Sequence, residues 1–217
     1  MSSRTRRVFL VLAPVFLLVA VAFSCGACNP PAEIVRPDDL RTQVPGATAL
    51  VVVYSRTGNT ARVARGCARA LGADFLRLQG EGGEGGSWFT TPLWTSTVKG
   101  TPGETPLEPY RLVLIGGPVW YWHPNALTTS FIKTSDLRGK DVVLFYTFEG
   151  GEMSAETERT WKQWVVDRGG TVIDLVGIDR KKLGPDASLE KEAERIAREH
   201  LQRWTSSRAK TEASPTP

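Results

Sequence analysis

The sequence has few of the residues on which most metal and catalytic sites depend. Its 217 residues include 3 cysteines and 2 histidines, and their spacing is not typical of a metal site or a Ser-His-Asp set. Two phosphate-binding motifs are also absent, because the chain has neither G-x-x-x-x-G-K-[ST] nor G-x-G-x-x-G. Hydrolysis is therefore disfavoured, and neither a metal site nor a catalytic residue set is predicted.

The charge balance does not indicate a nucleic-acid partner. The formal net charge is +4, but Arg4, Arg6 and Arg7 all precede Cys25 and no acid does. From Cys25 onward the chain has 24 basic residues against 23 acidic ones. A nearly neutral domain lacks the basic surface that nucleic acids attract.

Strands and helices alternate along the chain. Runs of apolar, β-branched residues without polar alternation predict buried strands, and apolar residues three or four positions apart predict helices. The strands are predicted at Leu50–Tyr54, Asp74–Leu78, Leu112–Ile115, Val142–Phe145 and Thr171–Gly177, and helices from Thr60, at Ser154–Arg168 and at Ser188–Trp204. This alternation predicts an α/β fold with a doubly wound, five-stranded parallel sheet. Cys67 falls on the apolar stripe of the first helix and is expected to be a buried thiol.

A turn rich in hydroxyl groups joins the first strand to its helix. It consists of Ser55, Arg56, Thr57, Gly58, Asn59 and Thr60. The first N–H groups of a helix lack internal partners and lie at the positive end of the helix dipole, so a turn of this composition suits a phosphate group. The same residue types also form ordinary helix caps.

The Ser-Arg-Thr-Gly-Asn-Thr turn, following a hydrophobic strand, resembles the FMN-phosphate loop of the flavodoxin family. The resemblance covers residues 49–204. It implies a flavodoxin-like sheet with the strand order 2-1-3-4-5 and FMN as cofactor, with its phosphate held by residues 55–60. It also implies that a loop after the third strand lies against the flavin ring.

Gly116-Gly117-Pro118 follows the third strand and is expected to end it as a turn, bringing the backbone close to a ligand. Aromatic side chains come next, and such rings on a loop need either a core or a flat ligand. The Gly-x-Pro-x-Trp pattern resembles the second flavin loop of flavodoxin-like proteins. By that resemblance the ring is lined by Pro118, Val119, Trp120 and Tyr121. The alternative is that the aromatics only fix the loop to the domain.

A third candidate loop follows the fourth strand. It contains Thr147, Phe148, Glu149, Gly150 and Gly151, and by the same resemblance it would cover the edge of the flavin ring. A carboxylate at Glu149 would disfavour the anionic reduced flavin and lower its reduction potential if the two are close. The alternative is that Glu149 faces water.

The N-terminus is predicted to be an export signal or membrane anchor over residues 1–28, because an apolar run follows a basic start. Thr5-Arg6-Arg7-Val8-Phe9-Leu10 resembles the twin-arginine signal, although ordinary secretory signals also carry paired arginines. A lipoprotein linkage, an uncleaved anchor and complete release all remain open. Residues 29–46 are expected to be a linker, 47–204 the domain and 205–217 a disordered tail. The predicted location is the periplasm or cell envelope.

Three functions are compatible with these features. The first is an FMN electron carrier that meets a redox partner protein. The second is an FMN-dependent NAD(P)H reductase with a quinone-type acceptor, in which segment 87–94 would form a pocket and Tyr121 or His123 would donate a proton. The third is a flavodoxin-like binding module without flavin.

Overall fold

The computed structural model describes residues 40–79, 105–182 and 187–212, and over these ranges it confirms the predicted α/β class. The predicted export signal, the first part of the linker and the aromatic segment 87–94 lie outside the described residues. Within the described ranges, no helix is long and apolar enough to span a membrane.

The sheet is mostly parallel and has seven strands rather than the predicted five. Its main path runs β1-β3-β2-β4-β6-β7, with β5 paired to β4 alone. Their bounds are β1 Arg41–Thr42, β2 Ala49–Val53, β3 Asp74–Arg77, β4 Leu112–Trp120, β5 His123–Pro124, β6 Asp141–Phe148 and β7 Thr171–Asp179. The two unpredicted strands, β1 and β5, have two residues each and pair in the antiparallel sense. Two residues are too few to show an alternating pattern in the sequence.

Three strands extend beyond their predicted ends: β4, β6 and, by two residues, β7. Gly116-Gly117-Pro118 does not end β4, because all three residues pair in register with Phe145, Tyr146 and Thr147 of β6. β6 accordingly continues through Phe148. The prediction of a turn at the two glycines was wrong, because the neighbouring strand supplies pairing that a single-strand pattern does not reveal.

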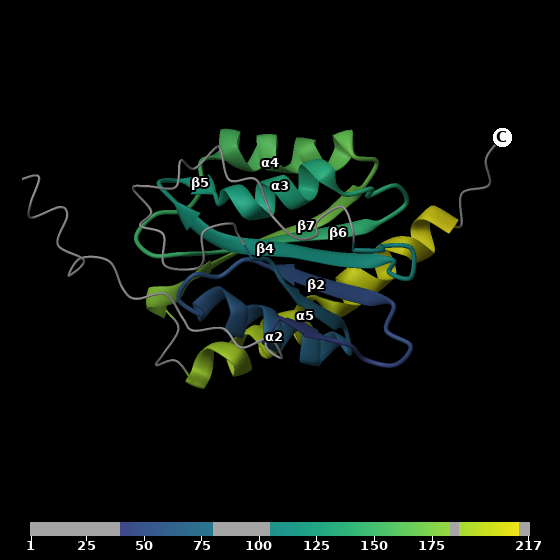
Figure 1. Cartoon of the computed structure of the whole chain (residues 1–217), viewed down its shortest axis with the longest axis horizontal. Coiled ribbons are helices and arrows are strands. Elements are labelled where there is room, and N and C mark those ends of the chain that lie inside the picture. Colours follow the sequence, from purple (N-terminus) through teal and green to yellow (C-terminus); the bar gives the residue numbers. More distant parts are fainter. Residues whose placement is uncertain (1–39, 80–104, 183–186, 213–217) are drawn as a thin grey trace, which may run out of the picture. The chain divides into compact units, whose positions relative to one another are not determined.

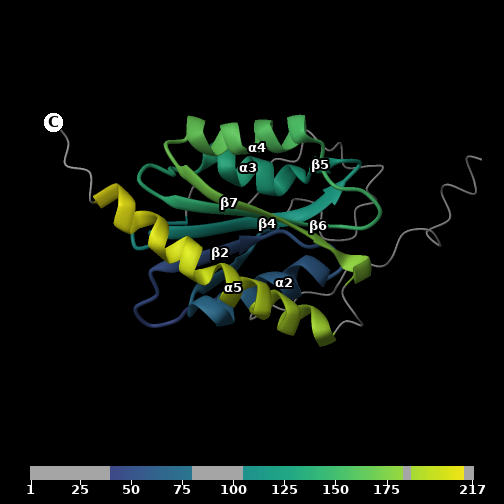
Figure 2. The same ribbon diagram turned by 180° about the vertical axis from the view of Figure 1, so that it is seen from behind.

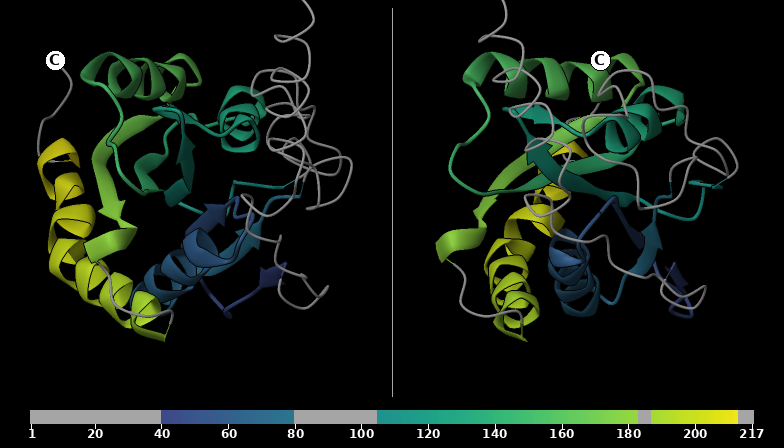
Figure 3. Two further views of the ribbon diagram at one scale, coloured as in Figure 1. Left: turned by 90° about the vertical axis from the view of Figure 1, so that its left-hand side faces the viewer. Right: turned by 60° about the vertical axis from the view of Figure 1, so that its left-hand side comes forward.

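Helices cover both faces of the sheet (Figure 1). α3, Ala126–Thr134, and α4, Ala155–Asp167, lie on one face, and α2, Asn59–Leu71, and α5, Ala187–Glu212, lie on the other. The view from behind shows α5 crossing next to α2 (Figure 2), and the side views separate the two helical layers (Figure 3). Each layer encloses its own hydrophobic core.

The ends of the domain differ from the prediction. Arg41 and Thr42 of the expected linker form β1 and pair with Leu76 and Phe75. At the other end, α5 continues past Trp204 to Glu212, so the first part of the expected disordered tail is helical. Cys67 is buried beneath α5, as its place on the apolar stripe predicts.

Candidate functional site

The three predicted loops meet at the carboxyl ends of β2, β4 and β6. The hydroxyl oxygens of Thr60 and Thr147 are 2.7 Å apart, which joins the first segment to the third. The ring of Tyr54, the residue before the first segment, makes an edge-to-face contact with Trp120 of the second segment, with centroids 6.0 Å apart. Residues distant in the sequence therefore form one candidate site at the edge where ligands bind in open α/β sheets.

The turn at residues 55–60 leads into α2 with Gly58 at the cap position, where φ is 83°. Gly58 has no side chain to accept hydrogen bonds from the first-turn N–H groups, and the first turn contains no acidic residue. The Asn59 amide instead donates to the Thr57 hydroxyl (3.4 Å). An uncapped helix start surrounded by hydroxyls suits an anion.

A buried arginine supports this turn from below. Arg77 ends β3, and its guanidinium donates a hydrogen bond of 2.6 Å to the backbone carbonyl of Ser55, which is itself buried. The bond fixes the start of the turn and brings a positive charge close to it. Arg77 was not among the predicted site residues, because in the sequence it is one polar residue at the end of a strand pattern.

Gly116 and Gly117 make room for side chains of the protein rather than for a ligand. A Cβ at Gly116 would overlap the Phe145 ring, and a Cβ at Gly117 would overlap the Asn125 amide nitrogen. Asn125 caps α3 by accepting from the Thr128 backbone N–H (2.9 Å), and its amide donates to the Pro118 carbonyl (3.3 Å). At these two glycines the backbone is close to Phe145 and to the start of α3, which occupy the space that the prediction gave to a ligand.

The predicted ring-lining segment Pro118, Val119, Trp120 and Tyr121 spans the end of β4 and a tight hairpin. Val119 pairs with Pro124, and Trp120 pairs with His123. Tyr121 and Trp122 form the connecting turn with φ of 49° and 64°. Two-residue hairpin turns with positive φ at both central positions strongly favour Asn-Gly, because bulky residues are strained there.

The third predicted segment divides between core and surface. Thr147 is buried beside Thr60, and Phe148 is buried in the core against Tyr146, with ring centroids 5.7 Å apart. Glu149 is exposed and accepts a hydrogen bond of 3.0 Å from Arg180, so a cation partly offsets its charge. Gly150 and Gly151 complete the segment, with φ of 90° at Gly150.

Trp122 joins the hairpin to this third segment. A Cβ placed on Gly151 would lie 2.9 Å from the indole nitrogen of Trp122, so the indole covers Gly151. Trp122 was not among the predicted site residues. Over the described ranges, no group of three or more metal-binding side chains is present.

No family model matches the chain, and no curated protein matches it. Solved structures match its fold. A putative flavoprotein from Bacteroides uniformis is 20% identical with a TM-score of 0.54, covering 68% of this chain and 97% of that one. A putative flavoprotein from Bacteroides eggerthii is 22% identical with a TM-score of 0.51, covering 70% of this chain and 98% of that one. Oxidised flavodoxin 2 from Bacillus cereus is 18% identical with a TM-score of 0.50, covering 74% of this chain and 99% of that one. The chain therefore has a flavodoxin-like fold.

Proposed function

We propose that the protein binds FMN at the carboxyl edge of the sheet and acts as an electron carrier. The main support is the start of α2, where a glycine cap, hydroxyl side chains and the absence of first-turn acids combine at one helix terminus. The strained aromatic hairpin adjoins it through the contact between Tyr54 and Trp120. A phosphate site beside exposed aromatic rings fits a molecule with a phosphate at one end and a flat ring at the other.

The pair of hydroxyls formed by Thr60 and Thr147 has one hydrogen available for donation. When the Thr60 and Thr147 hydroxyls bond to each other at 2.7 Å, only one of their two hydrogens is used, so the other can be donated to a ligand. Ser55, Thr57 and the first N–H groups of α2 would hold the phosphate, with Arg56 and Arg77 supplying positive charge. Bound FMN would supply the redox chemistry, while Trp120 and Tyr121 would shield its ring.

An FMN titration of the full chain tests this proposal, with riboflavin as the comparison ligand because it lacks the phosphate. We expect bound flavin to absorb at about 450 nm. Ser55→Ala should weaken FMN binding about 10- to 100-fold, since a hydrogen bond to a charged group contributes roughly 1.5–3 kcal/mol, and should leave riboflavin binding unchanged. Thr171→Ala, at the exposed start of β7, is the matched control.

The absence of flavin binding by the unaltered chain would refute the proposal, and equal losses for FMN and riboflavin would refute the phosphate contacts. Anaerobic addition of NADPH then separates two roles of a bound flavin. Flavin that stays oxidised fits a carrier awaiting a partner protein, whereas bleaching identifies a reductase.

We also propose that the protein is exported, on the basis of its basic and apolar N-terminal residues. Fusing residues 1–46 to a reporter that is active only outside the cytoplasm tests export. Replacing Arg6 and Arg7 with lysine should abolish export by the twin-arginine route and leave ordinary secretion intact. Retention of the unaltered fusion in the cytoplasm would contradict the proposal.

A further inference from the structure

A groove lies between α3 and α4, on the face of the sheet opposite α2 and α5. Its volume is about 870 Å³ and its lining is mainly apolar, which is typical of small-molecule sites of about 300–1,000 Å³. Ser130 and Lys133 line it from α3, and Thr160 and Trp164 line it from α4. In each helix the pair is three or four positions apart, so one face of each helix points into the groove.

The aromatic hairpin forms one end of this groove. Tyr121 and Trp122 both line it and are 52% and 60% exposed. Their positive φ values place two bulky side chains in a backbone region that such residues rarely adopt. Strain of this kind is concentrated at ligand sites, where it holds side chains in position. The hairpin backbone therefore places both rings at the groove without burying them in a core.

A single cation marks the other end. The Lys133 ammonium lies 4.0 Å from the centroid of the Trp164 ring, and in the described part of the chain no carboxylate is within 4 Å of it. Lys133 is in the last turn of α3, whereas Glu156, the acid in the lining, is in the first turn of α4. Because both helices begin at the carboxyl edge of the sheet, Glu156 lies toward the hairpin and Lys133 lies away from it.

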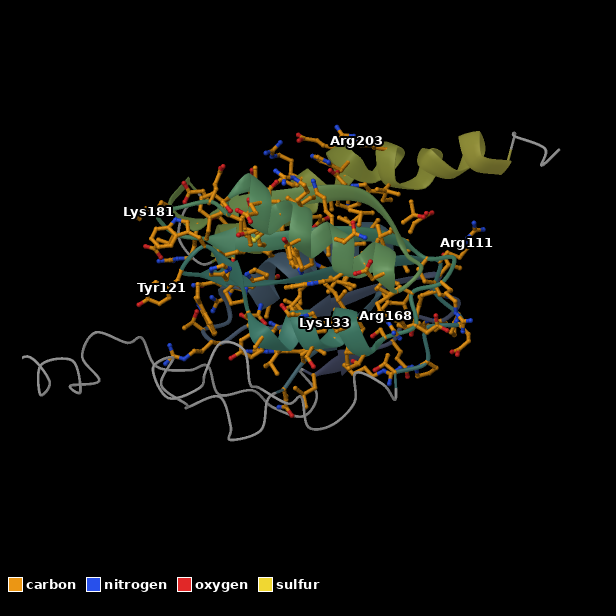
Figure 4. The ribbon with its side chains drawn as sticks, turned by 90° about the horizontal axis from the view of Figure 1, so that it is seen from above. Arg111, Tyr121, Lys133, Arg168, Lys181 and Arg203 are labelled. Atoms are coloured by element: carbon orange, nitrogen blue, oxygen red, sulfur yellow. The ribbon has the colours of Figure 1, made fainter. Side chains whose placement is uncertain are left out.

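The spacing of these features defines the size of a ligand. Lys133 is seven positions after Ala126 along α3, which corresponds to about 10 Å at the helical rise. Figure 4 shows Tyr121 at one end of this side of the molecule and Lys133 along α3. A complementary ligand is therefore flat and apolar over the length of two linked or fused rings, with its negative charge at the end remote from the hairpin.

We propose that the groove between α3 and α4 binds an aromatic molecule with one acidic group, its rings against Trp122 and Trp164 and its acid at Lys133. The lysine keeps its contact with the Trp164 face while donating to the acid, since an ammonium has three N–H donors. This site goes beyond the proposed flavin function, because Tyr121 is the one lining residue that also belongs to the predicted flavin contacts.

Two fluorescent probes test the proposal on the full chain without FMN. 1-Anilinonaphthalene-8-sulfonate carries the acid, and N-phenyl-1-naphthylamine is the same ring system without it. We expect Lys133→Met to weaken binding of the sulfonate at least about tenfold, the scale of one charge-assisted contact, and to leave binding of the neutral probe within about twofold. Trp122→Ala should weaken binding of both probes, because it removes a ring surface that they share.

Lys191→Met is the matched control, because Lys191 is an exposed lysine on α5, on the other face of the sheet. Circular dichroism and the urea midpoint establish that each variant is folded.

Failure of the sulfonate probe to bind the unaltered chain, or an equal effect of Lys133→Met and Lys191→Met, would overturn the proposal. Complete displacement of the probe by FMN would overturn it too, because the probe would then occupy the flavin site. A chain that binds the probe but no FMN would refute the flavin proposal and leave this one standing.

Discussion

Gly117→Ala should destabilise the protein strongly, because the start of α3 occupies the space above Gly117. The new Cβ would overlap the Asn125 amide nitrogen and lie 2.5 Å from the Thr128 hydroxyl oxygen. Overpacking a filled site costs roughly 1–3 kcal/mol. Displacing Asn125 also removes the cap of α3, which contributes about 1 kcal/mol. We therefore expect the free energy of unfolding to fall by about 2–4 kcal/mol.

Urea unfolding at 25 °C, followed by circular dichroism, measures this loss. Gly151→Ala is the matched control, because the new Cβ would meet the indole of Trp122, an exposed side chain that can move aside. We expect that substitution to change the free energy of unfolding by less than about 1 kcal/mol.

A double-mutant cycle identifies the cause of the loss at Gly117. Asn125→Ala removes the obstructing amide and the cap together, so Gly117→Ala should cost about 1 kcal/mol less in that background. Part of the cost remains, because the Thr128 hydroxyl still faces the new methyl group. Effects of the two substitutions that are additive within about 0.5 kcal/mol would refute the overlap with Asn125, as would a cost of Gly117→Ala no greater than that of Gly151→Ala.

Three further outcomes are expected. Thr60→Val should lower the free energy of unfolding by roughly 1–3 kcal/mol, because the buried Thr147 hydroxyl loses its partner; a loss below 0.5 kcal/mol in urea unfolding would contradict this. Burial alone would raise the pKa of Asp174, but hydrogen bonds from Trp204 and His200 hold it below its usual value. The ionised Asp174 therefore stabilises the fold above about pH 4, and this stabilisation is lost as the pH falls. The difference in urea midpoint between the unaltered chain and Asp174→Asn should accordingly become smaller below about pH 4. A difference that does not change with pH would refute this. Burial raises the pKa of the Cys67 thiol to about 12, so iodoacetamide at pH 8 should label Cys67 only after unfolding, as scored by peptide mass spectrometry.

The site contains interactions that sequence reasoning recovers and others that it misses. The turn at residues 55–60 is visible because a strand, a hydroxyl-rich turn and a helix follow one another within a few positions, and each has a local signature. Arg77 is not visible, because its contact with Ser55 depends on the pairing of β3 with β2. Trp122 was not predicted either, because its position over Gly151 depends on the hairpin and the end of β6 together.

The sequence by itself determined the alternation of strands and helices and the burial of Cys67, because both follow from the periodicity of neighbouring residues. It also located the three segments at the carboxyl ends of β2, β4 and β6. The tertiary structure alone decided that Gly116-Gly117-Pro118 continues a strand, since β6 supplies its pairing and Phe145 and Asn125 fill the space above it. The groove between α3 and α4 also exists only in the tertiary structure, because two helices separated in the sequence form its walls. Local patterns fix which elements form, whereas contacts between distant segments fix which side chains meet.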